Sequence, residues 1–154
     1  MQPLTAVSKE AYMAVKQLSV YLENEKGSLA EVAGLLADAG VNCRSMCIAD
    51  TRDFGVLRII ADEPELAERT LKEAGHAAKL REVVGFEIPD RPGGLAKALE
   101  LLDKNNINLE YMYVLIPKAR PSALVVARVD DNGRTEQLLT ENGIRVLSDV
   151  NLEA

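Results

Sequence analysis

The sequence contains, at residues 83–99, the stretch VVGFEIPDRPGGLAKAL, in which a strand pattern passes through a turn into a helix pattern. The segment from Val83 to Ile88, in which Glu87 is the one charged residue, is typical of a strand. Pro92 lacks an amide donor and suits a turn or the first turn of a helix. Gly93 and Gly94 allow either a positive φ or a close approach of the backbone to a neighbour. We therefore predict a strand, a tight turn and a helix that begins at Gly94.

The start of this predicted helix is a candidate anion site. The first amide groups of a helix have no partner within it, and the helix dipole places partial positive charge there. A small carboxylate can accept hydrogen bonds from such amides. The same residues also make an ordinary strand-to-helix turn, so this stretch alone leaves both interpretations open.

An earlier part of the chain repeats the pattern. The first matched pairs are 66 positions apart (93 − 27) and comprise Gly27 with Gly93, Leu29 with Leu95, and Asn42 with Asn108. Later pairs are 68 positions apart (143 − 75) and comprise Asp62 with Asp130, Leu71 with Leu139, and Gly75 with Gly143. A repeat unit of this size is a small domain rather than one turn of a solenoid. The sequence therefore predicts two similar domains.

Composition narrows the class of protein. The chain has 154 residues, of which 47% are hydrophobic and 27% charged, with a formal net charge of −6. This acidic balance disfavours nucleic acid and anionic membranes as partners, because both attract basic patches. No apolar run reaches the roughly 18 residues of a membrane span, and no signal-peptide pattern is present. We expect a cytoplasmic protein.

The cysteines and the histidine give no sign of a metal or redox site. Cys43 and Cys47 lie four apart, and on a regular strand such residues share a face at a distance of about 13 Å. That distance is too long for a disulfide. One Cys-x₃-Cys pair with the remote His76 is a poor metal site. We expect two reduced cysteines, no metal and no cofactor.

Both repeats predict the same order of elements, β-α-β-β-α-β. In the first repeat, strands are expected at 15–22, 41–50 and 54–62. A first helix is expected to be capped by Ser28, with Glu31 completing a capping box, and a second helix is expected to start at Pro64. Residues 76–88 form one β-rich run that serves as the last strand of the first repeat and the first strand of the second. The second repeat adds helices at 94–105 and 134–141 and strands at 108–116, 122–129 and 144–147. Because Lys26 replaces the proline of the later turn, we expect a looser first turn and either two unequal sites or one empty site, with the turn from Asp90 to Leu95 the better formed.

The fold class that follows is α+β. Each repeat is expected to form a four-stranded antiparallel sheet with two helices on one face, the ferredoxin-like arrangement. The predicted bounds are an N-terminal extension at 1–13, domains at 14–82 and 83–148, and a polar tail at 149–154. This fold serves many functions, so it does not by itself predict one.

At residues 14–148 the chain resembles the ACT domain, and more specifically small stand-alone proteins built of two ACT domains. The segments that carry the resemblance are Ile48-Ala49-Asp50-Thr51-Arg52-Asp53-Phe54-Gly55, Pro89-Asp90-Arg91-Pro92-Gly93-Gly94-Leu95-Ala96 and Asn108-Leu109-Glu110-Tyr111-Met112-Tyr113. The resemblance implies a non-catalytic regulatory module that binds a free amino acid between two paired domains. It also implies which residues form the site. The ligand would lie between the first strand-to-helix turn of one domain and the start of the second strand of the other.

One implied site combines the first turn with the later strand and comprises Asn24, Lys26, Gly27, Ser28, Leu29, Asn108, Leu109 and Glu110. The reciprocal site combines the second turn with the earlier strand and comprises Asp90, Arg91, Pro92, Gly93, Gly94, Leu95, Asn42 and Cys43. The amides of the turns suit a carboxylate, and the Asp90 carboxylate suits an ammonium group. Without the resemblance, Asn42 and Asn108 are equally well explained as turn residues that follow a helix.

Three other functions compete with this prediction. An enzyme is disfavoured because no nucleophile–base pair, phosphate loop or metal spacing is present, although catalytic groups can also converge only in space. A nucleic-acid binder could stack bases on Tyr111 and Tyr113, but the charge argues against it. A regulatory subunit of an amino-acid biosynthetic enzyme, such as acetolactate synthase, would share the amino-acid site and add an enzyme partner. We expect the stand-alone regulatory protein, as a homodimer or larger homo-oligomer.

Overall fold

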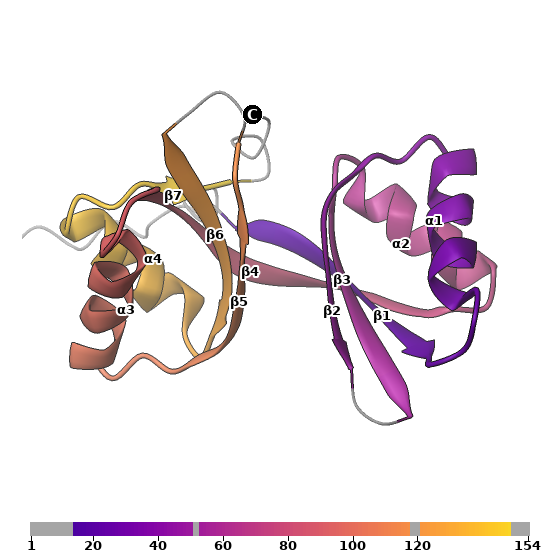
Figure 1. Cartoon of the computed structure of the whole chain (residues 1–154), viewed down its shortest axis with the longest axis horizontal. Coiled ribbons are helices and arrows are strands. Elements are labelled where there is room, and N and C mark those ends of the chain that lie inside the picture. Colours follow the sequence, from indigo (N-terminus) through magenta and orange to yellow (C-terminus); the bar gives the residue numbers. More distant parts are fainter. Residues whose placement is uncertain (1–13, 51–52, 118–120, 149–154) are drawn as a thin grey trace, which may run out of the picture. The chain divides into compact units, whose positions relative to one another are not determined.

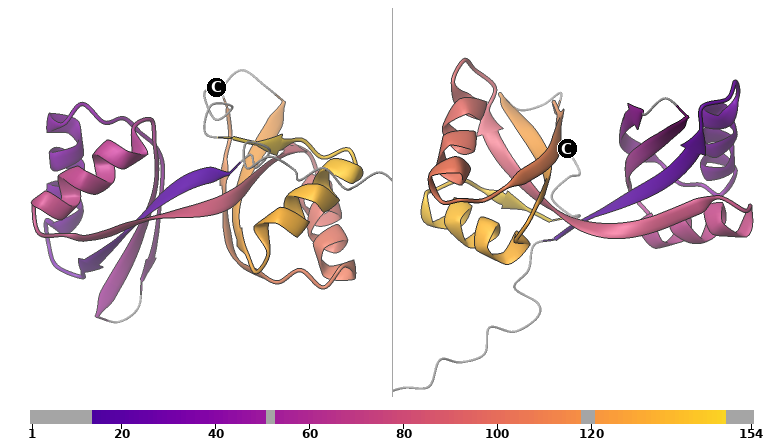
Figure 2. Two further views of the ribbon diagram at one scale, coloured as in Figure 1. Left: turned by 180° about the vertical axis from the view of Figure 1, so that it is seen from behind. Right: turned by 90° about the horizontal axis from the view of Figure 1, so that it is seen from below.

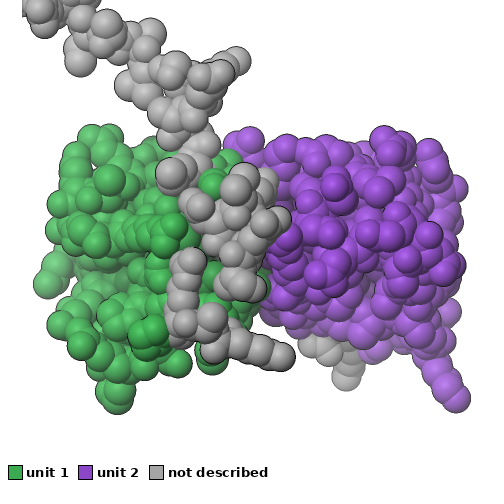
Figure 3. Space-filling model, turned by 90° about the horizontal axis from the view of Figure 1, so that it is seen from above, with its two compact units in different colours: residues 1–15, 84–154 green, residues 16–83 purple. Residues whose placement is uncertain are grey.

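The computed structural model describes residues 14–50, 53–117 and 121–148. The chain divides into two compact units, unit 2 at residues 16–83 and unit 1 at residues 84–154 together with the segment up to residue 15 (Figure 3). The predicted domain bounds, 14–82 and 83–148, stay predictions. The predicted extension at 1–13 and the tail at 149–154 lie outside the described residues.

Unit 2 is a sheet with two helices on one face (Figure 1). Its elements are β1 (Val15–Glu23), α1 (Ser28–Asp38), β2 (Cys43–Asp50), β3 (Phe54–Ala61), α2 (Pro64–Glu73) and the first part of β4 (Ala77–Pro89). The strand order is β2-β3-β1-β4, and β3 pairs antiparallel with both β1 and β2. Pro64 is the first residue of α2, as predicted, because its missing amide is not needed there.

Unit 1 repeats the arrangement, and both of its helices again cover one face of the sheet (Figure 2). After the second part of β4 come α3 (Gly94–Lys104), β5 (Leu109–Leu115), β6 (Ser122–Val129), α4 (Asn132–Glu141) and β7 (Val146–Leu147). β6 pairs antiparallel with β5 and β4, and β7 pairs with the other side of β4. The order β5-β6-β4-β7 matches that of unit 2, so the predicted pair of ferredoxin-like α+β folds is confirmed.

Each unit has its own hydrophobic core between its sheet and its helices. In unit 2, Leu36 of α1 and Leu71 of α2 pack against strand residues such as Leu57, and all three are fully buried. In unit 1, Phe86 of β4 and Leu139 of α4 have the same role. Each such side chain contributes about 1.5–3 kcal/mol through its removal from water. The apolar spacing that predicted the helices is therefore the spacing that builds both cores.

Two predicted helix starts were wrong. The N-cap of α1 is Gly27 at φ 92°, with no side-chain cap, and Ser28 is already helical, so the predicted capping box does not form. The αL backbone at Gly27 brings the chain into the helix one residue earlier than a serine cap would. The last helix begins at Asn132 rather than at 134, because the Asp131 side chain caps it by accepting a hydrogen bond from Arg134 N at 3.0 Å.

The two cysteines do not share a face of the sheet, contrary to the prediction from regular strand geometry. Cys43 pairs with Ala61, which belongs to the core, whereas Cys47 pairs with Arg58, the neighbour of the core residue Ile59. A register shift between Cys43 and Ser45 causes this change of side. Both cysteines are free thiols. None of the described helices is long and apolar enough to cross a membrane.

Candidate functional site

The turn between β4 and α3 is closed by backbone hydrogen bonds. The amide of Arg91 donates to the carbonyl of Pro89 at 3.0 Å, and the amide of Gly94 donates to the carbonyl of Arg91 at 3.0 Å. Gly93 is the N-cap of α3 and has φ 86°, the left-handed region that favours glycine. A Cβ added to Gly94 would lie 2.2 Å from the Pro89 carbonyl oxygen. Each of the two reasons predicted for a glycine therefore applies, one at Gly93 and the other at Gly94.

The first turn of α3 leaves amide donors free. Lys97 N donates to the Gly93 carbonyl at 3.1 Å, but the amides of Leu95 and Ala96 have no hydrogen bond to any described residue. The N-cap supplies no side-chain acceptor either. These amides lie beside the turn, where the helix dipole adds partial positive charge.

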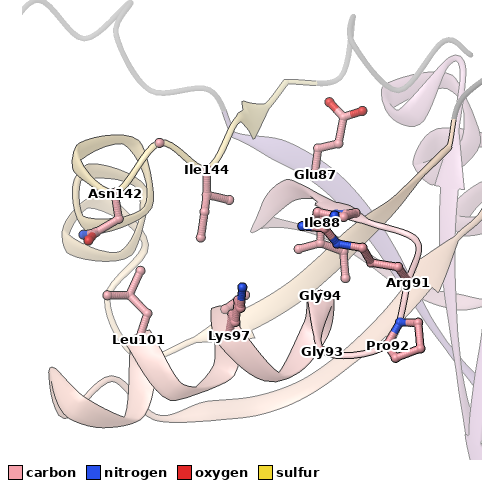
Figure 4. Close-up of a pocket in the computed structure, with 13 residues that line it drawn as sticks. Glu87, Ile88, Arg91, Pro92, Gly93, Gly94, Lys97, Leu101, Asn142 and Ile144 are labelled. Carbon is pink, nitrogen blue, oxygen red and sulfur yellow. The ribbon is translucent and has the colours of Figure 1, made fainter.

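A pocket of about 400 Å³ opens beside this turn, within unit 1 (Figure 4). Its lining comes from the end of β4, the turn, α3 and the segment from α4 to β7, and consists of Glu87, Ile88, Pro89, Arg91, Pro92, Gly93, Gly94, Lys97, Ala98, Leu101, Asn142, Gly143 and Ile144. Lys97 and Leu101 project from α3 toward the segment that carries Ile144. The volume lies at the lower end of the range for small-molecule sites.

The free charges of this pocket are positive. Neither Arg91 nor Lys97 forms an ion pair or side-chain hydrogen bond with any residue that the structure describes. The only acidic side chain in the lining is Glu87, and its carboxylate points away from α3. It accepts a hydrogen bond from Ser122 Oγ at 2.6 Å and lies 3.4 Å from Arg145 Nη1. The pocket can therefore receive an anion more readily than a cation.

Four of the predicted second-turn residues, Arg91 to Gly94, line this pocket. Asp90 does not: it is exposed, and its amide donates to the Pro121 carbonyl at 3.3 Å. Leu95 is half-buried against the core of unit 1. The structure thus places the turn glycines at a pocket and keeps the Asp90 carboxylate out of its lining.

The predicted strand residues have local structural roles. The carbonyl of Asn108 accepts a hydrogen bond from Asp130 N at 3.2 Å, and Leu109 packs against the core of unit 1. Glu110 forms an ion pair with Arg128, with 2.7 Å between Oε2 and Nε. These contacts match the interpretation of Asn108 as a connecting residue after a helix.

The equivalent residues of the first repeat have similar contacts. Asn42 N donates to Asp62 Oδ1 at 2.9 Å, and the Asn42 carbonyl accepts from Asp62 N at 3.1 Å. Cys43 packs against the core of unit 2, and burial, followed by the nearby charge of Asp62, raises the pKa of its thiol. A raised pKa keeps the thiol protonated and weakly nucleophilic.

The first turn follows the same backbone path without the proline. Glu25 N donates to the Glu23 carbonyl at 2.8 Å, and Ser28 N donates to the Glu25 carbonyl at 3.3 Å. Gly27 has φ 92° and ψ −10°, against φ 86° and ψ −11° at Gly93. Asn24, Lys26, Gly27 and Leu29 are exposed, and Ser28 is half-buried. The expectation that a ligand bridges a turn and a strand of paired domains stays a prediction.

Charges beside the first turn are the reverse of those beside the second. Glu25 stands at the position of Arg91, and Glu31 at that of Lys97. His76 stands at the position of Ile144, and its Nε2 lies 3.4 Å from Glu31 Oε1, within ion-pair distance but without hydrogen-bond geometry. The surface equivalent to the pocket is thus acidic in the first repeat.

Sequence reasoning missed Lys97, Leu101 and Ile144. Lys97 and Leu101 follow Gly93 at four-residue spacing, so they share the face of α3 above the turn. The predicted fold also placed the last strand of the repeat beside the first, which brings Ile144 near β4. Both signals were present in the sequence, but only the packed structure combines them. Among the described residues, no three His, Cys, Asp or Glu side chains gather as a metal ion would require.

Curated proteins similar to this chain are small subunits of one enzyme. The acetolactate synthase small subunit of Haemophilus influenzae is 35% identical over 66 residues, which cover 43% of this chain and 34% of that protein. The isozyme 3 small subunit from Escherichia coli matches with the same identity and coverage. The match therefore spans about a third of the length of these relatives.

Two solved structures are similar over most of the chain. A protein from Bacteroides thetaiotaomicron is 37% identical, covers 91% of this chain and 96% of its own length, and has a TM-score of 0.85. The ligand-free regulatory subunit of aspartate kinase from Thermus thermophilus covers 86% of this chain and 94% of its own, with a TM-score of 0.63. At 16% identity the second likeness shows the fold alone.

A family model described as an ACT domain pair matches residues 13–154. This range includes both glycine turns, both cores and the pocket of unit 1. The resemblance predicted from the three sequence segments is thereby confirmed. The chain belongs to the family of ACT domain pairs.

Proposed function

We propose that this chain is a non-catalytic regulatory protein that binds a free amino acid. The observation that carries the proposal is the pocket beside the β4–α3 turn, where Arg91 and Lys97, which have no partner among the described residues, lie next to apolar side chains. An amino acid brings a carboxylate for the donors and a side chain for the apolar wall. Membership of the ACT domain pair family supports the same class of function.

Regulation by a ligand requires that the ligand binds two arrangements of the protein with different affinities. A ligand can shift an equilibrium between two arrangements of the protein only as far as it binds one of them more tightly. A site built on a turn is suited to this, because a ligand that orders the turn also biases the helix and strand that the turn connects. The proposal therefore requires measurable binding and not catalysis.

Thermal unfolding of the full chain against the common amino acids, each at millimolar concentration, tests the proposal. A ligand at 100 times its dissociation constant adds about 2.7 kcal/mol to the free energy of unfolding. For a chain of this length we expect the melting temperature to rise by about 5 °C or more with one amino acid or one chemical group of them. A flat response across the whole panel contradicts the proposal.

The similarity to acetolactate synthase small subunits supports a second candidate, a regulatory subunit with an enzyme partner. Affinity purification of the native chain from its own cells distinguishes the two. Recovery of a catalytic subunit in stoichiometric amount supports the subunit. Recovery of the chain as a homo-oligomer alone supports the stand-alone regulator. Conversion of a metabolite by the chain, lost in Asp90→Ala, contradicts both.

A further inference from the structure

We propose that the unit 1 pocket binds a small aliphatic acid by its carboxylate, through Arg91 and Lys97, and that the equivalent surface of unit 2 does not. This inference deepens the proposed function and rests on it for the ligand being an amino acid. It adds the chemical group that is recognised and the repeat that recognises it.

The cations are the first support. Arg91 leaves the turn and folds back toward Ile88, while Lys97 projects from α3 one turn above Gly93 (Figure 4). Both side chains are free of ion pairs with the described residues, in a chain whose formal net charge is −6. Two unpaired cations that line one pocket attract a carboxylate and offer it charged hydrogen bonds.

The apolar wall is the second support. Leu101 and Ile144 lie on opposite sides of the opening (Figure 4), and the lining residues Ile88 and Ala98 are buried. All four side chains are aliphatic, so the wall fits a branched alkyl group rather than a polar or charged one. A pocket of about 400 Å³ holds such an acid without displacement of the backbone.

The third support is the orientation of Glu87, the acidic side chain of the lining, which does not face the pocket and so does not bind the ammonium group of a ligand there. The Glu87 carboxylate faces away from α3 and is engaged by Ser122 and Arg145. Recognition in this pocket therefore depends on the carboxylate and the alkyl group. An amino acid and its 2-oxo acid share both features and are expected to bind alike.

The first repeat lacks the required charges. Glu25 and Glu31 replace the two cations, and His76 replaces the aliphatic Ile144. Glu31 Oε1 lies 3.4 Å from His76 Nε2, so the imidazole at the position of Ile144 already faces a carboxylate. Two carboxylates repel a third at this position. We expect one such acid for each chain.

Isothermal titration calorimetry of the full chain tests the inference with three probes of similar shape: leucine, ketoisocaproate and isopentylamine. Ketoisocaproate lacks the ammonium group, and isopentylamine lacks the carboxylate. We expect both acids to bind once per chain and the amine to give no heat of binding. Methyl NMR with the same probes is expected to shift the signals of Leu101 and Ile144. Binding of the amine as tightly as the acids would overturn the inference.

Lys97→Gln is the matched perturbation, with Lys104→Gln on the same helix and Glu31→Gln in the first repeat as controls. We expect about tenfold weaker binding of ketoisocaproate to Lys97→Gln, the size of one lost charged hydrogen bond, and unchanged binding to both controls. Arg91→Gln is expected to behave as Lys97→Gln does. Equal affinity in all four variants would overturn the inference.

The probes also separate this inference from the proposed function. If leucine binds with the same affinity to wild type and Lys97→Gln, and the two methyl signals do not move, the amino acid uses another site and only the inference fails. If ketoisocaproate binds in the pocket and no amino acid of the panel does, the proposed function fails and the carboxylate site stands. If neither acid binds, the inference is overturned.

Discussion

The two glycine turns of this chain have the same backbone and different surroundings. Gly27 and Gly93 differ by 6° in φ (92 − 86), and each is followed by a helix with no side-chain cap. Position 28 carries a serine, whereas a Cβ at position 94 would overlap the Pro89 carbonyl oxygen. The second helix start therefore packs more closely onto the preceding strand than the first.

This difference teaches that the turn and the pocket are separate features. The positive φ of one glycine produces the turn in both repeats, with or without a proline. The pocket needs in addition the tight packing at Gly94, the cations of α3 and the turn, and an aliphatic residue from the α4–β7 segment. In the first repeat the corresponding positions carry Ser28, Glu25, Glu31 and His76, so the same turn there has different neighbours.

Exchange of the residues at the close contact is expected to have the largest effect. Gly94→Ser should lower the free energy of unfolding by about 3 kcal/mol, because a Cβ has no room beside the Pro89 carbonyl. Ser28→Gly, the reciprocal change, should cost well under 1 kcal/mol. Urea denaturation of the full chain measures both. Equal stability of Gly94→Ser and wild type would break the comparison.

The shared turn conformation is tested by alanine at each N-cap. Gly27→Ala and Gly93→Ala should each cost about 1–2 kcal/mol, because both positions have positive φ with open space around them. Gly34→Ala, at an uncrowded glycine inside α1, is the control and should stabilise by up to about 1 kcal/mol. Clearly unequal costs at Gly27 and Gly93 would contradict a common turn.

The second helix of each repeat offers a smaller contrast. Asp131 caps α4 through its side chain, whereas Glu63, the N-cap of α2, makes no such bond. We expect Asp131→Ala to lower the free energy of unfolding by about 1 kcal/mol and Glu63→Ala to leave it nearly unchanged. The denaturant midpoints of the two variants measure both losses of stability. A larger loss in Glu63→Ala would reverse the assignment of the caps.

The smallest expected effect is on the stability of the fold at acidic pH. A hydrogen bond from Lys16 lowers the pKa of Glu65 in α2, and position 133, its counterpart in α4, is glycine. Because the pKa is lower in the folded chain, this carboxylate stabilises the fold above its ordinary pKa of about 4.3 and loses that contribution as the pH falls below it. Glu65→Gln should flatten the pH dependence of stability slightly in this range. A steeper dependence in Glu65→Gln would be inconsistent with the contact.

Several features of the fold could be predicted from the sequence because they depend on neighbours along the chain. The apolar spacing of the helices, the alternation of the strands and the fixed φ of Pro64 are local, and each predicted its element to within a few residues. The cap of α1 failed for a local reason too, because serine and glycine compete for adjacent positions and the αL glycine places the helix start one residue earlier.

The pocket could be predicted only in part. Its turn residues, Arg91 to Gly94, follow from the repeat, whereas Ile144 comes from 50 residues further along the chain (144 − 94). The predicted Asp90 faces solvent, because the turn directs its amide to the Pro121 carbonyl and leaves the side chain outside the pocket lining. Residue type predicted the turn, but the direction in which the Asp90 side chain points depended on the packing of the whole unit.

The sequence by itself determined that this protein has two βαββαβ repeats, each with a glycine turn before its first helix, because periodicity and positive φ are properties of short segments. Only the tertiary structure decided which residues line the pocket of unit 1 and which faces the cysteines take. The pocket requires contact among α3, β4 and the α4–β7 segment, and the cysteine faces require the register of β2 against β3. Both depend on contacts between residues far apart in the chain, and no short segment contains them.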